Sequence, residues 1–521
     1  MQQIVLLPVL LFVSYCRAAN ILAVIPTPSY SHQIAFTAIW KELSLRGHSV
    51  TLITTDPLND PKLTNLTEID IKWAYKYMAD VTSKITDSQS FSMWNMAKTF
   101  GDMFLPMMHE QMNYPPVQEL LQDKSKHFDV VIVEHIYPEF LGFAEVFNCP
   151  KIFVGSLDTW TYVHNYIGNF IHPILYPELG AYFFDQLSFK ERVISTLYSW
   201  HIWKYHMLDG LVLKEKILHE HFNTTVPLVS LLQDLDLLIL NVNPVIQGVR
   251  AVGPTTINIG GYRPAVTKPP PLPKDLQEFL DGAKEGFIYF SLGSNVKSKD
   301  LSKETLNSVI STLRELPYKV LWKFEADTLP GKPENVKLVK WTPQQAVLAH
   351  RNIKLFITQG GLQSMEEGIY HEVPFVVIPF FADQEQNAGI MRSRGIAKIV
   401  NKDPFIKQEE LKEAVLEVIQ NPRYKETVQR IKRLSLDFPM TGLEQAIWWI
   451  EHVIRNNGTK HLRNPTADLP TYQYYLLDVL GFFALVFFSS LLLVIIVARF
   501  LIRTFRQHIK IHISLGKLKA H

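Results

Sequence analysis

The residues with the clearest capacity for chemistry stand in one segment, residues 341–387, which reads WTPQQAVLAHRNIKLFITQGGLQSMEEGIYHEVPFVVIPFFADQEQN. Within it the apolar strand IKLFIT runs into Gly360 and Gly361, and we expect a following helix that begins near Met365 with Ser364 as its cap. Backbone N–H groups and the helix dipole at such a turn bind anions such as phosphate. The segment therefore predicts a phosphate site at the end of a strand.

The same segment carries groups suited to a base, a diol and a sugar. Trp341 offers a flat aromatic face on which a nucleobase could stack. The carboxylates of Glu366 and Glu367 could accept hydrogen bonds from a ribose diol. After the next apolar strand, Asp383 and Gln384 form a polar pair able to bind hydroxyl groups. One linear segment thus supplies aromatic, phosphate, diol and sugar contacts.

A candidate general base lies far upstream, in the sequence PSYSHQ, where His32 follows an apolar strand at the start of a helix. The positive end of the helix dipole disfavours the imidazolium, so the ring stays neutral and able to accept a proton. Glu134 ends a later strand in FDVVIVE. Its carboxylate could orient the His32 ring and stabilise its charged form. If His32 is not the base, His135 and Asp158 are the next candidates.

These motifs resemble the signature of the UDP-glycosyltransferase family, in which W-x-P-Q is followed by T-H-G-G, a Ser, a Glu eight residues after the His, and D-Q. The resemblance also covers SLGS at residues 291–294, the N-terminal leader, an apolar C-terminal span and a lysine tail, and is therefore nearly full length. It implies a GT-B fold, in which two Rossmann-like α/β domains face a cleft. The donor would bind the C-terminal domain and the acceptor the N-terminal domain.

The resemblance also implies roles for individual residues. Trp341 and Gln344 would hold the uracil, Glu367 the ribose, and Asp383 and Gln384 the transferred sugar. His32 stands at the place of the family's catalytic His, and Glu134 at that of its helper Asp. The residues that would hold the diphosphate are Ser294, Gln359, Gly361 and Ser364.

Two positions depart from the family pattern. Gln359 replaces the usual His, so the group can still donate a hydrogen bond to phosphate but cannot carry positive charge. Glu134 is one methylene longer than the usual Asp. A Gln at the first position resembles insect-type members, which favours UDP-glucose as the donor, with UDP-glucuronate as the alternative. The implied reaction is an inverting, metal-independent hexosyl transfer in detoxification or metabolite conjugation, with UDP-sugar as co-substrate and no cofactor.

The elements that must position these groups form two α/β sets. A strand at residues 21–26, a helix over 31–46 closed by Gly47, and a strand at 49–54 form a βαβ opening. Fully apolar strands that alternate with helices indicate parallel sheets covered on both faces. Further predicted strands are 129–133, 151–154 and 236–240 in the first set, and 286–292, 319–324, 353–358 and 375–379 in the second.

A proline-rich stretch, RPAVTKPPPLPKD at residues 263–275, separates the two sets. Such composition is typical of a semi-rigid spacer. We therefore predict an acceptor-binding Rossmann-like domain at 20–262 and a UDP-sugar-binding domain at 276–460, with a cleft between them.

Both ends of the chain predict a membrane anchor. Residues 1–19 resemble a secretory signal peptide. Residues 479–498 carry no charge, and at about 1.5 Å per residue they could span a bilayer core. Residues 499–521 are basic without an acidic residue, which places this tail in the cytosol. We expect a single-pass type I protein of the endoplasmic reticulum membrane with a lumenal catalytic body.

Lys517 and Lys519 resemble a dilysine retrieval signal for the endoplasmic reticulum, with a contact to anionic lipid as the alternative. Three sequons lie before the span and would be lumenal, at Asn65, Asn223 and Asn457. Outside the presumed leader Cys149 is the single cysteine, so no internal disulfide is expected.

The acceptor site is the least specified part of the sequence. Seven of the twelve methionines fall within residues 78–112, which suits either helical core packing or an adaptable apolar pocket. A second aromatic stretch, residues 182–206, could pack on the core, line the same pocket or touch the membrane surface. We expect a small lipophilic acceptor, and its identity stays open.

Several other functions are disfavoured. A net charge of +2 and the lack of a basic stripe argue against nucleic-acid binding. Asp234 and Asp236 resemble a metal-binding DxD motif but precede their strand, and His219 and His221 stand beside a sequon, so no metal site is expected. Neither first strand is followed by G-x-G-x-x-G, which argues against a nicotinamide oxidoreductase. A non-catalytic binder on the same fold is the main rival, and homo-oligomerisation is left open.

Overall fold

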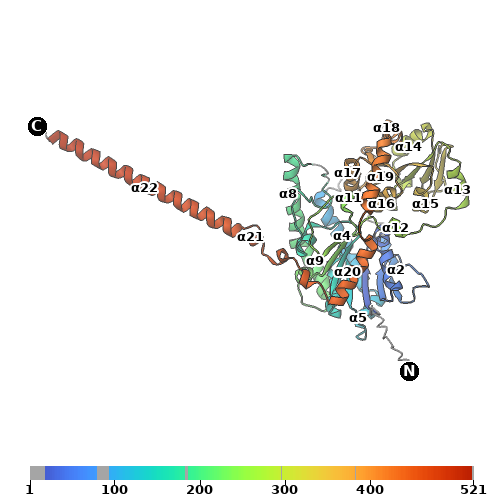
Figure 1. Cartoon of the computed structure of the whole chain (residues 1–521), viewed down its shortest axis with the longest axis horizontal. Helices are drawn as coiled ribbons and strands as arrows, with labels where there is room; N and C mark the ends of the chain where they lie inside the picture. Colours follow the sequence, from blue (N-terminus) through green and yellow to red (C-terminus); the bar gives the residue numbers. More distant parts are fainter. Residues whose placement is uncertain are drawn as a thin grey trace, which may run out of the picture. The chain divides into compact units, whose positions relative to one another are not determined.

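The structure is a computed structural model that describes residues 18–78, 93–181, 183, 186–294, 296–381 and 383–518. The predicted signal peptide lies outside this range except for its last two residues, and so does the end of the tail from residue 519. The chain divides into two compact units, Met1–Asn464 and Pro465–His521. The first unit contains both predicted sheets, and the second contains the long C-terminal helix (Figure 1).

The first sheet has seven parallel strands in the order β3-β2-β1-β4-β5-β6-β7. In β1, Ile21 and Ala23 point to one face and Leu22 and Val24 to the other, and all four are buried. Such strands must be covered on both sides. The strands are β1 (Asn20–Ile25), β2 (Ser49–Thr54), β3 (Leu66–Asp70), β4 (Val130–Glu134), β5 (Lys151–Gly155), β6 (Leu237–Leu240) and β7 (Thr256–Asn258).

The two faces of this sheet have different coverings. One face packs against α2 (Thr37–Leu45) and α20 (Gly442–Asn456), which lie at the front in Figure 1. By sequence α20 falls in the predicted domain 276–460, yet its apolar side chains pack on the first sheet. The other face is covered by α4 (Met93–Met112), α5 (Pro115–Gln122), α6 (Gly142–Phe147), α7 (Thr161–Tyr166), α9 (Leu211–Phe222) and α10 (Leu228–Gln233).

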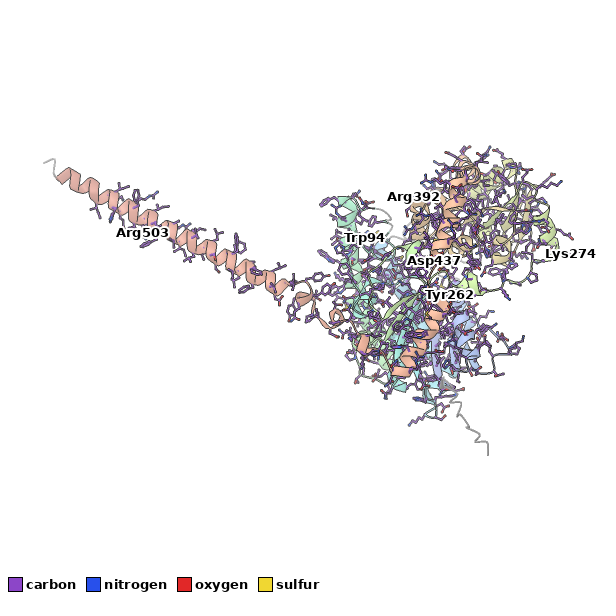
Figure 2. All side chains as sticks on the ribbon, viewed as in Figure 1. Trp94, Tyr262, Lys274, Arg392, Asp437 and Arg503 are labelled. Atoms are coloured by element: carbon purple, nitrogen blue, oxygen red, sulfur yellow. The ribbon has the colours of Figure 1, made fainter. Side chains whose placement is uncertain are left out.

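The predicted helix over residues 31–46 is interrupted. The structure has α1 (Tyr30–Ile34) and α2, with a break at Ala35 and Phe36. Gly47 closes α2 with φ of +93°, as predicted for a residue after a helix end. The hydroxyl of Tyr262, labelled in Figure 2, donates to the carbonyl of Ala35 at 2.5 Å, so the break is tied to the end of the N-terminal half.

The second sheet has six parallel strands in the order β10-β9-β8-β11-β12-β13. Its strands are β8 (Phe287–Ser291), β9 (Lys319–Lys323), β10 (Val336–Val339), β11 (Ile353–Thr358), β12 (Phe375–Val377) and β13 (Ala397–Ile399). Helices α14 (Lys303–Glu315) and α18 (Gln408–Gln420) pack on one face. The other face carries α13 (Lys274–Asp281), α15 (Gln344–Leu348), α16 (Leu362–Tyr370), α17 (Gln384–Ser393) and α19 (Pro422–Leu436). The prediction of two parallel α/β domains is confirmed.

The remaining helices are short or lie outside the two cores. They are α8 (Phe189–Lys204), α11 (Pro244–Gln247), α12 (Arg263–Val266) and α21 (Thr471–Tyr474). The C-terminal helix α22 (Leu477–Leu518) contains the predicted span. Within it Leu477–Ile511 is long and apolar enough to cross a membrane, and its most apolar stretch of 18 residues has a mean hydropathy of 2.9.

Candidate active site

Two cavities of the first unit meet at a shared wall. The first is lined mainly by apolar side chains, several of them from α4. The second lies against the ends of β8, β9 and β11. His32, Asp383 and Gln384 line both cavities. A molecule in one cavity can therefore meet a molecule in the other at these three residues.

The second cavity collects the predicted donor residues. Every residue to which the family resemblance gives a donor role lines it, although they come from four separate stretches of the chain. They are Ser294, Trp341, Gln344, Gln359, Gly361, Ser364, Glu367, Asp383 and Gln384. We call this cavity the donor cleft.

The glycine turn in the donor cleft has the expected backbone geometry, with one correction. Gly360 has φ of +89°, which favours glycine, and Gly361 is the N-cap of α16. The helix begins at Leu362, three residues before the predicted start, so Ser364 lies in its first turn and is not the cap. Because the helix starts earlier, its first N–H groups, which have no partner within the helix, belong to the residues directly after the glycine turn.

Gln359 lies against a second glycine. A Cβ added to Gly293, whose φ is +76°, would approach Gln359 Nε2 far inside contact distance. The positive φ favours glycine at this position of SLGS, and without a Cβ there the Gln359 amide can lie against the turn. Gln359 Oε1 accepts a hydrogen bond from Thr358 Oγ1 at 3.0 Å, which leaves the amide N–H groups as donors toward the cleft.

Glu367 is the centre of a hydrogen-bond network in the cleft. Gln344 Nε2 donates to Glu367 Oε2 at 2.7 Å and also contacts Ser364 Oγ at 3.1 Å. Arg263, in α12 at the start of the proline-rich linker, forms an ion pair with Glu367 Oε1. Three predicted donor residues are thus connected to one another before any ligand binds.

The neighbouring Glu366 points elsewhere, although the sequence offered both carboxylates for the ribose. It is 3% exposed and accepts hydrogen bonds from Gly261 N at 2.8 Å and Asn241 Nδ2 at 3.3 Å. Burial raises its pKa to about 7, against the hydrogen bonds that lower it. Glu366 therefore joins α16 to the end of the N-terminal half, and Glu367 is the carboxylate that lines the cleft.

Trp341 stands at the rim of the donor cleft with its side chain 62% exposed. Tyr30 approaches its edge with ring centroids 6.0 Å apart, and Lys323 Nζ lies 5.5 Å from the ring centroid. Lys323 Nζ also donates to the carbonyl of Gly293 at 2.8 Å. The exposed indole is available for stacking, with a cation beside it.

Asp383 and Gln384 are held at the start of α17. Asn387 Nδ2 donates to Asp383 Oδ2 at 2.7 Å and to the carbonyl of Gly360 at 2.9 Å. Gln384 Oε1 accepts from Phe380 N at 2.9 Å, which directs its amide nitrogen away from that backbone. Burial raises the pKa of Asp383, against the Asn387 hydrogen bond and the His32 charge that lower it.

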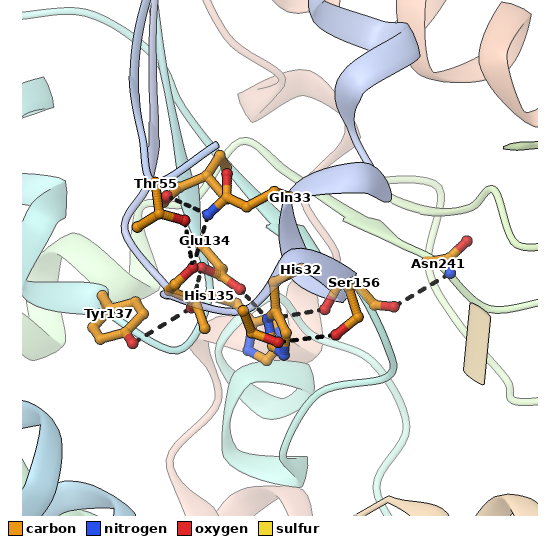
Figure 3. Close-up of polar contacts among 12 residues, drawn as sticks. His32, Gln33, Thr55, Glu134, His135, Tyr137, Ser156 and Asn241 are labelled. Carbon is orange, nitrogen blue, oxygen red and sulfur yellow. Dashed lines mark hydrogen bonds and ion pairs between the residues drawn. The ribbon is translucent and has the colours of Figure 1, made fainter. Parts of the chain in front are cut away.

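The His32–Glu134 pair is assembled as the sequence suggested (Figure 3). His32 Nδ1 lies 2.5 Å from Glu134 Oε1 and 3.1 Å from Ser156 Oγ. The other carboxylate oxygen, Oε2, accepts a hydrogen bond from Thr27 Oγ1 at 2.5 Å. Because Nδ1 faces these partners, Nε2 is the ring nitrogen left for a substrate.

The electrostatics of the pair depend on Glu134, as predicted, more than on the helix dipole. Helix α1 has only five residues, so its dipole is a minor influence on the ring. Glu134 is fully buried, and burial alone would raise its pKa. The His32 charge and the hydrogen bonds from His32 and Thr27 outweigh burial and hold the pKa of Glu134 below its usual range. Glu134 therefore stays ionised and can stabilise the imidazolium.

The two reserve candidates for the base have other partners. His135 is buried, Thr159 Oγ1 lies 3.0 Å from its Nδ1, and burial lowers its pKa to about 4. Asp158 contacts His164 Nε2 at 3.0 Å and Arg250 at 3.2 Å. Burial would raise the pKa of Asp158, but the Arg250 and His164 charges lower it well below its usual range. Neither is arranged like the His32–Glu134 pair.

We call the first cavity the acceptor cavity. It shows whether the methionine-rich stretch packs in the core or lines a pocket. Met107 and Met112 of α4 are packed in the core of the first domain. Met96 and Met108, on the same helix, line the cavity. The helix therefore serves both interpretations, because Phe104 and Met108 belong to the core and also line the cavity. Other apolar residues that line the cavity include Phe100, Phe104, Leu105, Ile136, Trp160, Ile202 and Phe381.

The geometry agrees with a comparison of the sequence with known families. The sequence profile described as "UDP-glucoronosyl and UDP-glucosyl transferase" matches residues 20–513. The chain belongs to this family. As a UDP-glycosyltransferase it is 30% identical to UDP-glycosyltransferase UGT5 from Dactylopius coccus, over 93% of this chain and 92% of that protein. It is also 30% identical to human UDP-glucuronosyltransferase 2B7, over 87% of this chain and 88% of that protein.

Solved structures confirm the fold of this UDP-glycosyltransferase. A UDP-glucosyltransferase from Polygonum tinctorium superposes with a TM-score of 0.57 at 16% identity, covering 84% of this chain and 99% of that one. TcCGT1, solved in complex with UDP, superposes with a TM-score of 0.58 at 15% identity, covering 84% and 100%. Together with the two parallel sheets, these likenesses confirm the GT-B architecture.

Several residues of the glycosyltransferase site were missed by sequence reasoning. Gln33 Nε2 donates to the carbonyls of Ile25 and Thr27 and so shapes the loop that carries His32. Ser156, Arg263 and Lys323 also line the donor cleft. Gln33 could have been suspected because it follows His32 in PSYSHQ, whereas the others join the site only through folding.

The sequons and the rejected metal ligands occupy different surroundings. Asn223 and Asn457 are exposed, whereas Asn65 is half-buried and donates to the carbonyls of Ser44 and His48.

His219 contacts the carbonyl of Val226 at 3.3 Å. His221 Nε2 instead lies 3.0 Å from His109 Nδ1, with Glu220 nearby, and these three groups are within metal-ligand distance of one another. Asp234 pairs with Lys151, and Asp236 with backbone N–H groups.

Proposed function

We propose that the enzyme transfers a hexose, with glucose favoured, from a UDP-sugar to a hydroxyl group of a small lipophilic acceptor. The observation that supports this most is the shared wall. His32 and Asp383 line both the donor cleft and the apolar acceptor cavity, so an acceptor hydroxyl and a donor sugar can meet there. The biological role would be conjugation of metabolites or detoxification.

The proposed reaction is a direct displacement. His32 Nε2 takes the proton of the acceptor hydroxyl while Glu134 stabilises the imidazolium. The acceptor oxygen forms a bond to the anomeric carbon, and the bond from that carbon to the UDP oxygen breaks. The released diphosphate is stabilised by Gln359, Ser364 and the N–H groups after Gly361. Attack from the opposite side converts an α-linked donor into a β-linked product.

No metal or cofactor takes part in this proposal. In the donor cleft the charge of the leaving group would be met by backbone N–H groups, amide donors and Lys323. Transfer assays with and without a chelator test this point. Loss of activity in the chelator, restored by a divalent cation, would contradict it.

Donor choice and stereochemistry can be tested together. Purified full-length enzyme in detergent is incubated with a simple phenol and either UDP-glucose or UDP-glucuronate, and the product linkage is determined by NMR. We expect a β-glucoside as the main product. If the main product came from UDP-glucuronate, UDP-glucose would not be the preferred donor. An α-linked product would contradict the direct displacement. A lack of transfer with any UDP-sugar would favour a non-catalytic binder.

We also propose that the helix Leu477–Ile511 anchors the enzyme in the endoplasmic reticulum membrane as a single-pass type I protein with its catalytic unit in the lumen. The support is the apolar helix followed by basic residues. Protease added to sealed microsomes should remove only the C-terminal tail. Degradation of the catalytic unit without detergent would contradict this topology.

A further inference from the structure

The acceptor cavity is mainly apolar, but three ionisable side chains gather at one part of its wall. Lys214 of α9 and His206 of the helical turn Tyr205–Gly210 line the cavity. Glu139, in the short helix Pro138–Leu141, is fully buried behind them, with Oε2 3.9 Å from Lys214 Nζ. We call these three residues the polar wall.

The polar wall is poorly satisfied within the protein. Lys214 Nζ donates to the carbonyl of Ile136 at 2.8 Å, and it donates no other hydrogen bond among the described residues. Among the residues that the structure describes, neither carboxyl oxygen of Glu139 has a hydrogen-bond partner, and His206 Nε2 has none either. Buried polar groups normally find partners, because an unmet donor or acceptor costs free energy.

Lys214 and Glu139 do not form a close ion pair. Charge-assisted hydrogen bonds between nitrogen and oxygen are shorter, about 2.7–2.9 Å. At 3.9 Å the ammonium group is directed to the Ile136 carbonyl and to the cavity rather than to Glu139. Burial lowers the pKa of Lys214 and raises that of Glu139, so the isolated pair is a weak one.

His206 is fixed beside this cation as a neutral ring. Its imidazole stacks on Tyr162 with ring centroids 3.5 Å apart and is 4% exposed. Burial, with a smaller effect of the Lys214 charge, lowers its pKa to about 3. A neutral imidazole has one ring N–H, which can donate a hydrogen bond to an oxygen of a bound carboxylate.

We propose that the polar wall is a recognition site for a carboxylate on the acceptor, with Lys214 as its main ligand and His206 as a second contact. The preferred acceptors are then amphipathic hydroxy acids. Their hydroxyl group lies at His32, their apolar body lies against α4, and their carboxylate lies at Lys214. This inference rests on the proposed transfer to a hydroxyl group and adds the chemical class of the acceptor.

The test compares each acid with its methyl ester, because the ester has the same apolar body without the charge. Suitable probes are 4-hydroxybenzoic, 3-(4-hydroxyphenyl)propionic and 5-(4-hydroxyphenyl)pentanoic acids, which vary the span between the two ends. In the wild type at least one acid should have a KM about 10-fold or more below that of its ester, since hydrogen bonds to charged groups are the stronger ones. Equal or better use of every ester would overturn the proposal.

The variants separate recognition from folding. Lys214→Met should raise the KM of the preferred acid about 10- to 100-fold and leave its ester nearly unchanged. Lys216→Met, on the same helix but with a side chain 68% exposed, should change neither KM. Glu139→Gln removes the competing carboxylate and should lower or preserve the KM of the acid. An equal rise in KM for acid and ester in Lys214→Met would assign Lys214 to structure and overturn the proposal.

A double variant covers the case in which Lys214→Met does not fold. Glu139→Gln combined with Lys214→Met leaves no unpaired buried charge, and it should fold yet lose the preference for the acid. Persistence of that preference would overturn the proposal. Binding of acid and ester to the UDP-saturated wild type, followed by tryptophan fluorescence, gives a readout without turnover. Selective binding without any transfer would contradict the proposed function but support the carboxylate site.

Discussion

His32 Nδ1 and Glu134 Oε1 lie 2.5 Å apart, although 102 residues separate them in the sequence. They meet because β1 and β4 are parallel neighbours, with Val24 beside Val133, so both chains leave the sheet at the same edge. Glu134 is the last residue of β4, and His32 follows β1 in the first short helix. The core of the sheet therefore determines the position of the pair that we assign to proton transfer.

Replacement of His32 tests that assignment. Loss of a general base typically costs about 10²–10⁴ in rate, so His32→Ala should lower kcat by about that factor while UDP binding changes little. Acidic phenols, which ionise unaided, should be affected least. A matched control is His127→Ala, since that side chain is 68% exposed. Normal transfer to a weakly acidic alcohol by His32→Ala would place the base elsewhere.

Glu134 should act through His32. Glu134→Gln keeps a hydrogen-bond partner for the ring but removes charge compensation, so kcat should fall less than in His32→Ala. Glu134→Asp keeps the charge, but its carboxylate must withdraw from His32 or from Thr27, both now at 2.5 Å. We expect its kcat to lie between those of the wild type and Glu134→Gln. Steady-state kinetics with one acceptor checks the order, and a greater loss in Asp than in Gln would show that position matters more than charge.

Glu367 should contribute to donor binding. Glu367→Ala removes the acceptor for the ribose diol. It also breaks the ion pair with Arg263 and one of the two hydrogen bonds of Gln344 Nε2. The Kd for UDP, measured by calorimetry, should rise about 10- to 100-fold. Glu278→Ala, in α13 with a side chain 69% exposed, serves as a control because Glu278 does not line the cleft. An unchanged Kd in Glu367→Ala would mean that this carboxylate does not hold the ribose.

Titration of Glu366 should make stability depend on pH. Its pKa is raised from about 4.5 to about 7, so the folded state binds the proton more tightly than the unfolded state. The resulting stabilisation is fully present below pH of about 4.5 and is lost as the pH rises toward 7, by up to about 3 kcal/mol. Glu366→Gln should therefore flatten the fall of Tm over this window, as followed by thermal unfolding. An identical pH profile in wild type and Glu366→Gln would contradict it, and exposed Glu278→Gln is the control.

The three sequons should differ in occupancy. Asn223 and Asn457 are exposed in turns with positive φ, where a glycan has room. Both amide hydrogens of Asn65 are used, toward the carbonyls of Ser44 at 2.9 Å and His48 at 2.7 Å. Asn223→Gln and Asn457→Gln should each increase gel mobility by one glycan, and Asn65→Gln should not. A mobility change in Asn65→Gln alone would reverse this assignment.

Local sequence determined much of the donor side. Residues 341–387 place a strand, a glycine turn, a helix and a second strand in immediate succession, so their polar groups lie near one another in the fold. The parallel sheets were predictable for a similar reason, since fully apolar strands between helices have few other ways to be buried. The start of α16 was missed by three residues because Gly361, not Ser364, caps it, and helix ends depend on backbone geometry.

Tertiary structure alone decided the relationships between distant residues. Only the folded chain shows that Glu366 joins the two halves while adjacent Glu367 lines the cleft, because successive helix residues point in different directions. It also decided that α20 returns to cover the first sheet, and that Lys214, Glu139 and His206 meet at the acceptor cavity. Sequence patterns report which groups must be buried, but the partners of a buried group depend on packing between segments that are far apart in the chain.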